Sequence, residues 1–332
     1  MKKGLLFIVV TLSIIPLSCG PERPLTVGFW NVENLFDLED DPIKDDDEFT
    51  PMGRKHVTGD ILATKLENLS EVLTKMDADV LGLAEVENRR VAEMLDERCT
   101  RRDYTVIEYE SPDFRGIDVA FLYDAARFRV LSSEPVPVDL GEARPTRDIL
   151  HVRGEFAGET LHIFVNHWPS HWDGTEQTNP FRAKAARTLR SQIDAILKDD
   201  PAAEIVVLGD LNDQPTAPSV ATHLGCTLSR DSVSVGRPTL WNLMAPFLDR
   251  VNQGTYKYRG NDLVYDQIIV SPGLTDSKGL TVLPRSLEIF DGPKYRQQEG
   301  MFRGYPFRFW AGDSLLGGYS DHLPVMVSIG VN

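Results

Sequence analysis

Residues 205–213 constrain the fold of this chain more than any other stretch, and they read Ile-Val-Val-Leu-Gly-Asp-Leu-Asn-Asp. The first four residues are apolar, three of them are β-branched, and together they predict a strand buried on both faces. Gly209 is expected to end that strand, and the polar residues after it to form a turn. If the backbone stays extended, Asp210 and Asn212 point to one side at the rim of a sheet. A carboxylate there can accept a proton or bind a cation, although a capped loop explains the same pattern.

Several other predicted strands also carry polar residues at or near their ends. Residues 25–32 and 79–85 are two of them, and residues 149–156 and 160–165 predict a hairpin. Residues 261–270 predict a strand with Asp266 among apolar residues, where an unpaired charge would be costly. The polar side chains placed in this way are Asn31, Glu85, His167, Asp210, Asn212, Asp266, Asp321 and His322. Coincidence could explain two or three of these placements, but hardly all of them.

Clustered carboxylates repel one another, so a site that gathers these residues needs shared protons or a bound cation. Carboxylate and amide oxygens select Mg²⁺, Mn²⁺ or Ca²⁺ over zinc. The pair Asp321-His322, which lies just before the last predicted strand, is the most specific local signal. The alternative for each single residue is an ordinary turn, cap or core position.

The remaining elements follow from hydrophobic periodicity. Helices are predicted over residues 61–76, 88–98 and 179–197, the last with Asn179 as its cap and Pro180 at its first position. Residues 104–109 and 117–123 predict two strands, joined by a loop that contains Glu110. Arg144 and Arg147 lie on another loop, where they could clamp a phosphate or form surface salt bridges. The acid-rich run of residues 37–48 predicts a solvated loop, with calcium binding as a weaker option.

The N-terminus has the pattern of an export signal. Lys2 and Lys3 precede a mostly apolar stretch that ends at Cys19, and it is short for a membrane span. It resembles a bacterial lipoprotein signal, which implies removal of residues 1–18, lipidation of Cys19 and a tether over residues 19–24. We therefore expect an exported lipoprotein of the cell envelope, periplasmic or on the outer-membrane surface, or a secreted protein if Cys19 is not lipidated. The acyl group would anchor the domain to a membrane that the fold itself does not enter.

Charge and composition restrict the classes of partner. The chain has 332 residues, 42% of them hydrophobic and 26% charged, which is ordinary for a globular protein. Its net charge of -15 repels nucleic acid at long range, although a bound divalent cation can reverse the local field. Beyond Cys19, only Cys99 and Cys226 remain, and the sequence leaves open whether they pair. We infer no protein partner and expect a monomer.

The motifs Gly209-Asp210-Leu211-Asn212 and Ser320-Asp321-His322, in this order, resemble those of the endonuclease/exonuclease/phosphatase superfamily. The opening Asn-Val-Glu-Asn-Leu-Phe-Asp at residue 31 and the Val-Asn-His-Trp at residue 165 are similar to secreted bacterial nucleases of that superfamily. The resemblance covers residues 25–331. It implies a four-layer α/β sandwich, in which two mixed β-sheets pack face to face with helices on the outside.

The same resemblance implies a role for each matching residue. Asn31 and Glu85 would hold the divalent metal, with Asp321 completing or supporting the site. Asp210 would orient or deprotonate the attacking water, and Asn212 would bind the phosphate. His322, held by Asp266, would contact the scissile phosphate. His167 would be a second imidazole, as in the deoxyribonuclease branch, with Glu110 as the candidate to steady it.

The leading hypothesis is therefore a metal-dependent phosphodiester hydrolase, a nuclease that cleaves DNA or RNA by in-line attack of water. Mg²⁺ is the expected cofactor, with Mn²⁺ or Ca²⁺ as alternatives. A second hypothesis is a phosphatase or phosphodiesterase that acts on a small or lipid-linked phosphate, such as an inositol phosphate or sphingomyelin. A third is a binding protein that kept the fold and lost activity, for which Asp210→Ala and His322→Ala would leave function unchanged.

Overall fold

The structure is a computed structural model of the chain and describes residues 22–141, 145–172, 174–248 and 250–332. The predicted signal over residues 1–18, the lipidation site Cys19 and the candidate clamp Arg144 lie outside the described residues. Among the described residues, no helix combines the length and the apolar character that a membrane crossing requires.

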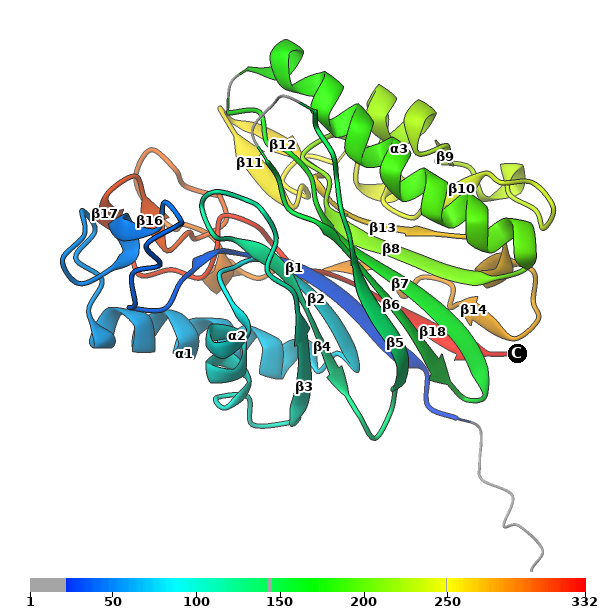
Figure 1. Cartoon of the computed structure of the whole chain (residues 1–332), viewed down its shortest axis with the longest axis horizontal. Helices are drawn as coiled ribbons and strands as arrows, with labels where there is room; N and C mark the ends of the chain where they lie inside the picture. The colour runs from blue at the N-terminus through cyan, green and yellow to red at the C-terminus, as the bar shows by residue number, and fades with distance from the viewer. Residues whose placement is uncertain (1–21, 142–144, 173, 249) are drawn as a thin grey trace, which may run out of the picture.

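Two large mixed sheets dominate the molecule (Figure 1). In hydrogen-bonding order, the first contains β14 (Leu280–Val282), β18 (Val325–Val331), β1 (Leu25–Leu35), β2 (Val80–Val86), β4 (Asp118–Asp124) and β3 (Tyr104–Glu108), and β15 (Glu288–Ile289) also pairs with β18. The second contains β5 (Arg129–Val136), β6 (Ile149–Phe156), β7 (Glu159–His167), β8 (Glu204–Asp210), β13 (Asp266–Val270), β10 (Leu240–Asn242) and β9 (Cys226–Thr227). Two small hairpins are β11 (Tyr256–Tyr258) with β12 (Asn261–Leu263), and β16 (Trp310–Ala311) with β17 (Ser314–Leu315).

Helices cover the outer faces of both sheets (Figure 1). The first sheet is covered by α1 (Gly59–Met76) and α2 (Arg89–Asp96), and the second by α3 (Thr175–Asp199). Short helical segments are η1 (Asp47–Phe49), η2 (Ser219–His223), η3 (Arg230–Ser232), η4 (Ala245–Phe247), η5 (Pro272–Thr275) and η6 (Pro293–Tyr295). The predicted four-layer α/β sandwich is thus confirmed.

Three buried clusters correspond to the three interfaces between these layers. Side chains such as Phe29, Val165 and Leu208 fill the space between the two sheets. A second cluster, which includes Leu69, lies under α1 and α2, and a third, which includes Leu189, lies under α3. A continuous apolar strand such as β8 is explained by this arrangement, because its residues alternate between two buried interfaces.

Some predicted boundaries need correction. The predicted strand over residues 261–270 is two strands, so Asp266 opens β13 instead of lying inside a longer strand. The third helix begins at Thr175, which places Pro180 inside the helix and not at its first position. Gly209 lies within β8, which continues to Asp210. These differences arise at strand and helix ends, where local sequence patterns are least specific.

The connectivity brings several strand ends to one edge of the sandwich. β1 and β2 run parallel, as do β7 and β8, so the carboxyl ends of each pair lie together. β13 is antiparallel to β8 and β18 is antiparallel to β1, so each begins where its neighbour ends. We call this edge the site pole, and it is where the predicted polar residues converge.

The sequence left open whether Cys99 and Cys226 pair. In the structure both are free cysteines.

Candidate active site

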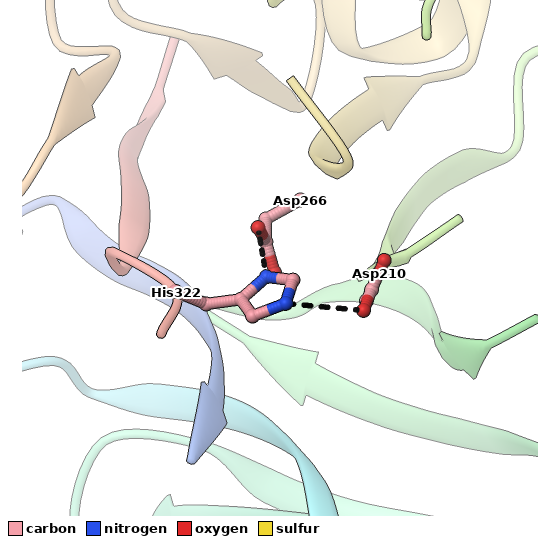
Figure 2. Close-up of side chains that lie close together, drawn as sticks. All are labelled: Asp210, Asp266 and His322. Carbon is pink, nitrogen blue, oxygen red and sulfur yellow. Dashed lines mark hydrogen bonds and ion pairs between the residues drawn. The ribbon is translucent and has the colours of Figure 1, made fainter. Parts of the chain in front are cut away.

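The centre of the site pole is a cluster of Asp210, Asp266 and His322 (Figure 2). Asp210 ends β8 and is directly opposite Asp266 in the register of β8 with β13. The Nδ1 atom of His322 lies 2.7 Å from Oδ2 of Asp266, and its Nε2 lies 3.8 Å from Oδ2 of Asp210. Their ligand atoms lie within 4.8 Å of one another, and no other group of three His, Cys, Asp or Glu residues among those described does so.

Charge sets the protonation of this cluster. Burial lowers the pKa of His322, but the charges of Asp266 and Asp210 outweigh it and raise that pKa well above its usual value. Burial raises the pKa of Asp210 to about 7, against the attraction of His322. The cluster therefore holds a proton on the imidazole and a carboxylate that can exchange a proton near neutral pH.

Asn31 connects this cluster to Glu85. Its side-chain Nδ2 donates to Oδ2 of Asp210 at 3.1 Å and to Oε1 of Glu85 at 3.2 Å. The other oxygen of Glu85 accepts a hydrogen bond from the backbone N of Asn34 at 2.9 Å. The amide oxygen of Asn31 accepts from the backbone N of Glu33 at 3.0 Å. The structure thus brings Asn31 and Glu85 together as predicted, with the amide nitrogen of Asn31 facing the two carboxylates.

Backbone irregularities aim these side chains. The register of β1 with β2 shifts between Asn31 and Leu35, and that of β2 with β4 shifts around Glu85. Glu85 has a φ of 64° and Asn212 a φ of 49°, conformations that non-glycine residues rarely adopt. Bulges and strained backbone of this kind concentrate at functional sites, where they turn a side chain away from its regular direction.

His167 closes the site on the side of β7. Its Nε2 lies 3.7 Å from Oδ2 of Asp210 and 3.9 Å from Oε1 of Glu85. Burial, then the charges of Arg147 and Arg115, lower the pKa of His167 well below its usual value, so the ring is neutral. A neutral imidazole can donate to or accept from a phosphate oxygen without adding charge.

Asn212 lies after β8 and is anchored by the backbone. Its backbone N donates to Oδ1 of Asp210 at 2.9 Å, and its Nδ2 donates to the carbonyl of Trp168 at 3.0 Å. Because its φ is positive, the strand does not stay extended from Asp210 to Asn212. Asp210 and Asn212 nevertheless remain in contact, through the hydrogen bond from the Asn212 backbone to the Asp210 carboxylate and not through strand alternation.

Asp321 is next to the cluster but has a cationic partner of its own. Its Oδ2 lies 2.7 Å from Nη2 of Arg308, which also approaches Glu33. Glu33 is 2% exposed and accepts hydrogen bonds from the backbone N atoms of Phe309 and Trp310. Burial, together with Asp321, raises the pKa of Glu33 to about 7, and burial lowers the pKa of the nearby Lys65 to about 8.

Two predicted substrate-binding residues have their hydrogen-bond and ion-pair partners outside the cluster. Arg147 is buried, pairs with Asp113 at 2.9 Å and donates to the carbonyl of Trp168 at 2.8 Å. Glu110 is exposed, and its ion-pair partner is Lys44 at 3.8 Å. The contact expected between Glu110 and His167 is not present, because Glu110 follows the end of β3 and faces solvent. Nδ1 of His167 is buried and has no hydrogen-bond partner among the described residues.

Sequence inspection assigned no role to three contributors to this site. Tyr256 stacks on the ring of His322, with centroids 4.6 Å apart, and it lies in a segment without clear periodicity. The buried Glu33 could have been noticed from its spacing of two residues after Asn31. Ser320 donates to the carbonyl of Asn31 at 2.7 Å and accepts from the backbone N of His322 at 3.1 Å. It thereby ties the start of β18 to the end of β1.

The donor chemistry fits a hard divalent cation. Glu85 and Asp210 are held on either side of one amide group, and within the described part of the chain neither carboxylate forms an ion pair with a Lys or Arg. Two carboxylates that share so small a space are stabilised by a cation between or beside them. The ligand atoms that these two carboxylates offer are oxygens, which suits Mg²⁺, Mn²⁺ or Ca²⁺.

A four-layer sandwich with carboxylates and histidines gathered at one pole defines a class of phosphoesterase hydrolases. The chain belongs to the endonuclease/exonuclease/phosphatase family, whose family model matches residues 26–330. A comparison with curated protein sequences found no match.

Solved structures agree with this assignment at the level of the fold. Humanized D. rerio TDP2 has 17% identity and a TM-score of 0.59, covering 93% of this chain and 99% of that one. The human nocturnin catalytic domain has 17% identity and a TM-score of 0.56, covering 94% and 97%. ANGEL2, described as a 2',3'-cyclic phosphatase, has 15% identity and a TM-score of 0.59, covering 92% and 95%.

Proposed function

We propose that this protein is a divalent-metal-dependent phosphodiester hydrolase, and specifically a nuclease that cleaves DNA or RNA by in-line attack of water. The observation that carries the proposal is the arrangement of His322, held by Asp266, opposite Asp210 and the Asn31–Glu85 pair. D. rerio TDP2, which shares the fold, has been solved with a single-stranded DNA product. The presence of His167 as a second imidazole supports the nuclease over a phosphatase, as the resemblance to secreted nucleases implies.

Each side chain has a defined task in such a reaction. Glu85 would hold the metal, with Asp321 in support, and Asn31 would join them through its oxygen once its amide turns, because its nitrogen now faces Glu85 and Asp210. When bound, a divalent cation offsets the charge of the phosphoryl oxygens and lowers the pKa of a water. Asp210 orients the attacking water and accepts its proton, as its raised pKa allows. Asn212 binds the phosphate next to it.

The two histidines complete the chemistry. Protonated His322 places a positive charge beside the scissile phosphate, and Asp266 keeps the ring oriented and charged. His167 reaches the same space from β7 as a neutral hydrogen-bonding group. Positioning and electrostatic stabilisation of this kind need no covalent intermediate.

The test is cleavage of plasmid DNA and of RNA by purified protein with Mg²⁺ or Mn²⁺, followed by chelation and metal add-back. At limiting metal concentration, Glu85→Gln should strongly reduce cleavage, whereas Glu93→Gln, which removes an exposed carboxylate on α2, should leave it unchanged. A folded protein that is inert on both substrates with both metals would reject the nuclease.

The second candidate is a phosphatase or phosphodiesterase for a small or lipid-linked phosphate. It is favoured by the net charge of -15, which opposes binding of long polyanions. A panel of phosphorylated sugars, inositol phosphates and sphingomyelin separates it from the nuclease. Turnover of one of these without cleavage of DNA or RNA would establish it.

We further propose that residues 1–18 are an export signal and that Cys19 carries a lipid, followed by a tether to residue 24 and the catalytic domain over residues 25–331. The protein would then be a monomer held at the cell envelope. Metabolic labelling with a palmitate analogue, compared with Cys19→Ser, tests the anchor. A Cys19→Ser protein that is labelled equally would contradict it.

A further inference from the structure

A cavity opens on the side of the sandwich where β10 and β14 lie, on the right in Figure 1. Its volume is about 460 Å³, and its walls come from β10 of the second sheet, β14 of the first, and the short segments η3, η4 and η5. Trp241 of β10 pairs with Val270 at the end of β13, and Val282 of β14 pairs with Ile329 near the end of β18. Because β13 and β18 begin at the site pole, these walls lie toward their other ends, and no residue of the candidate active site lines the cavity.

Apolar side chains form most of the wall of this cavity. Leu243 and Leu274 belong to the buried core between the two sheets, whereas Trp241, Phe247 and Val282 pack against that core and are only half-buried. The apolar interior of the sandwich therefore continues into the cavity. Sites for small molecules are typically concave and mostly apolar, with volumes of about 300–1,000 Å³. The cavity lies at the lower end of that range, which suits one alkyl chain better than a lipid with two.

The charged groups around this cavity are all cationic. Arg230, Arg250 and Arg285 line it, and none of the lining residues that the structure describes is an Asp or Glu. That is notable in a chain with 50 acidic and 35 basic residues. Within the described ranges, none of the three arginines forms an ion pair with a carboxylate, and Arg250 donates instead to the amide oxygen of Gln253 at 3.2 Å. A group of cations without counter-ions attracts an anion.

Arg230 is held in place beside the apolar wall. Its Nη2 donates to the carbonyl of Thr275, and its Cζ lies 5.8 Å from the centroid of the Trp241 ring, which also lines the cavity. The residue is exposed, so its charge lies at the mouth. Its other N–H groups donate to no acceptor among the described residues, and a guanidinium can bind a carboxylate or a phosphate through two of them. A fixed cation beside an apolar cavity is the complement of an amphiphile with an anionic head.

We propose that this cavity binds an amphiphile with one alkyl chain and an anionic head group. Trp241, Phe247 and Val282 contact the chain, and its burial contributes binding free energy in proportion to the apolar area removed from water. Arg230 binds the head at the mouth, and Arg285 adds positive charge. The head selects the ligand, because a neutral head gains no ionic hydrogen bond from the guanidinium. A fatty acid and a single-chain phosphate monoester share this chemistry.

Calorimetry tests the proposal with purified Cys19→Ser protein, in which no lipid on Cys19 can compete for the cavity. Dodecanoate, its neutral glycerol monoester and butyrate are each titrated up to about 1 mM. We expect one dodecanoate per chain, bound about tenfold or more tightly than the neutral ester, and no binding of butyrate, which lacks the long chain. Dodecyl phosphate in a parallel titration distinguishes the two heads. Tighter binding than dodecanoate assigns the site to a phosphate head, and weaker binding assigns it to a carboxylate.

Single substitutions separate the head from the chain. Arg230→Gln should weaken dodecanoate binding about tenfold and leave the neutral ester unchanged, so the preference for the anion disappears. Arg285→Gln should weaken dodecanoate binding by about two- to fivefold, since its side chain acts through charge alone. Phe247→Ala should weaken both ligands by a similar factor, because it removes part of the apolar wall. Arg303→Gln, which removes an exposed arginine that does not line the cavity, should change neither.

Thermal unfolding checks the fold of each variant, and if Phe247→Ala does not fold, the exposed Arg230→Gln carries the test. The proposal is overturned if dodecanoate does not bind, or if it binds no more tightly than the neutral ester. It is also overturned if Arg230→Gln and Arg303→Gln bind dodecanoate equally well. Neither a divalent cation nor cleavage enters these measurements, so a failure here is distinct from a failure of the proposed function.

Discussion

The carboxylate of Asp266 and the imidazole of His322, 56 residues apart in the chain, meet at 2.7 Å. Asp266 opens β13 and His322 precedes β18, strands that belong to different sheets. The pair therefore depends on the packing of one sheet against the other. It also sets the charge of the imidazole, since Asp266 contributes strongly to raising the pKa of His322.

Asp266→Asn should reduce kcat by about 10²–10⁴-fold with little change in KM, because the amide cannot hold His322 protonated and oriented. Steady-state kinetics on the best substrate measure both constants, and thermal unfolding checks the fold. Unchanged kcat in a well-folded variant would mean that His322 does not act as a charged group.

Tyr256 covers the face of His322, with the two ring centroids 4.6 Å apart. Tyr256→Ala should lower activity by roughly 2–10-fold, because stacking between rings contributes about 0.5–1.5 kcal/mol. Tyr256→Phe keeps the ring and should stay near wild type. Equal losses in both variants would point to the hydroxyl group instead.

Glu85 and Asp321 should differ in their effect on the metal requirement. Glu85→Gln removes a carboxylate that has no cationic Lys or Arg partner among the described residues, so the Mg²⁺ concentration for half-maximal activity should rise about tenfold or more. Asp321→Asn should raise it less, since Asp321 is neutralised by Arg308 at 2.7 Å. Metal titrations of the two variants compare them directly, and equal shifts would assign Asp321 as a full ligand.

Arg147→Ala should destabilise the protein by about 1–3 kcal/mol, because it removes the hydrogen-bonded cation from the buried Oδ2 of Asp113, while Arg115 stays 3.7 Å from Oδ1. Chemical denaturation measures this loss. If Arg147 is instead a phosphate clamp, one of the two roles that the sequence allows, Arg147→Ala should raise KM and leave the stability unchanged. The two outcomes distinguish a structural arginine from a substrate-binding one.

Asp118 should make stability depend on pH. Burial raises its pKa from 3.8 to about 7, so the folded state binds a proton that the unfolded state releases. The stabilisation is complete below about pH 4 and is lost as the pH rises through 7, with a slope of up to about 1.4 kcal/mol per pH unit. Asp118→Asn should flatten the curve of unfolding free energy between pH 4 and 7. A curve as steep as that of the wild type would show that other groups cause the dependence.

The sequence by itself determined the strands and their polar ends. The run at residues 205–208 is apolar throughout because β8 is buried on both sides, and such a run is recognisable without a structure. The polar residues at or near the ends of β2, β7 and β8, and Asn31 in β1, followed from the same local pattern. The family resemblance then supplied their grouping and the four-layer fold, and the structure confirms the fold.

Only the tertiary structure decided which partner each side chain has. Arg147 and Asp321 are both charged residues on loops, but one lies in a buried pair with Asp113 and the other beside Arg308. The positive φ of Glu85 and the stacking of Tyr256 on His322 likewise depend on distant segments. A hydrophobic pattern reports only which face of an element is buried. The distance between two charges depends on how the sheets pack, which involves residues hundreds of positions apart.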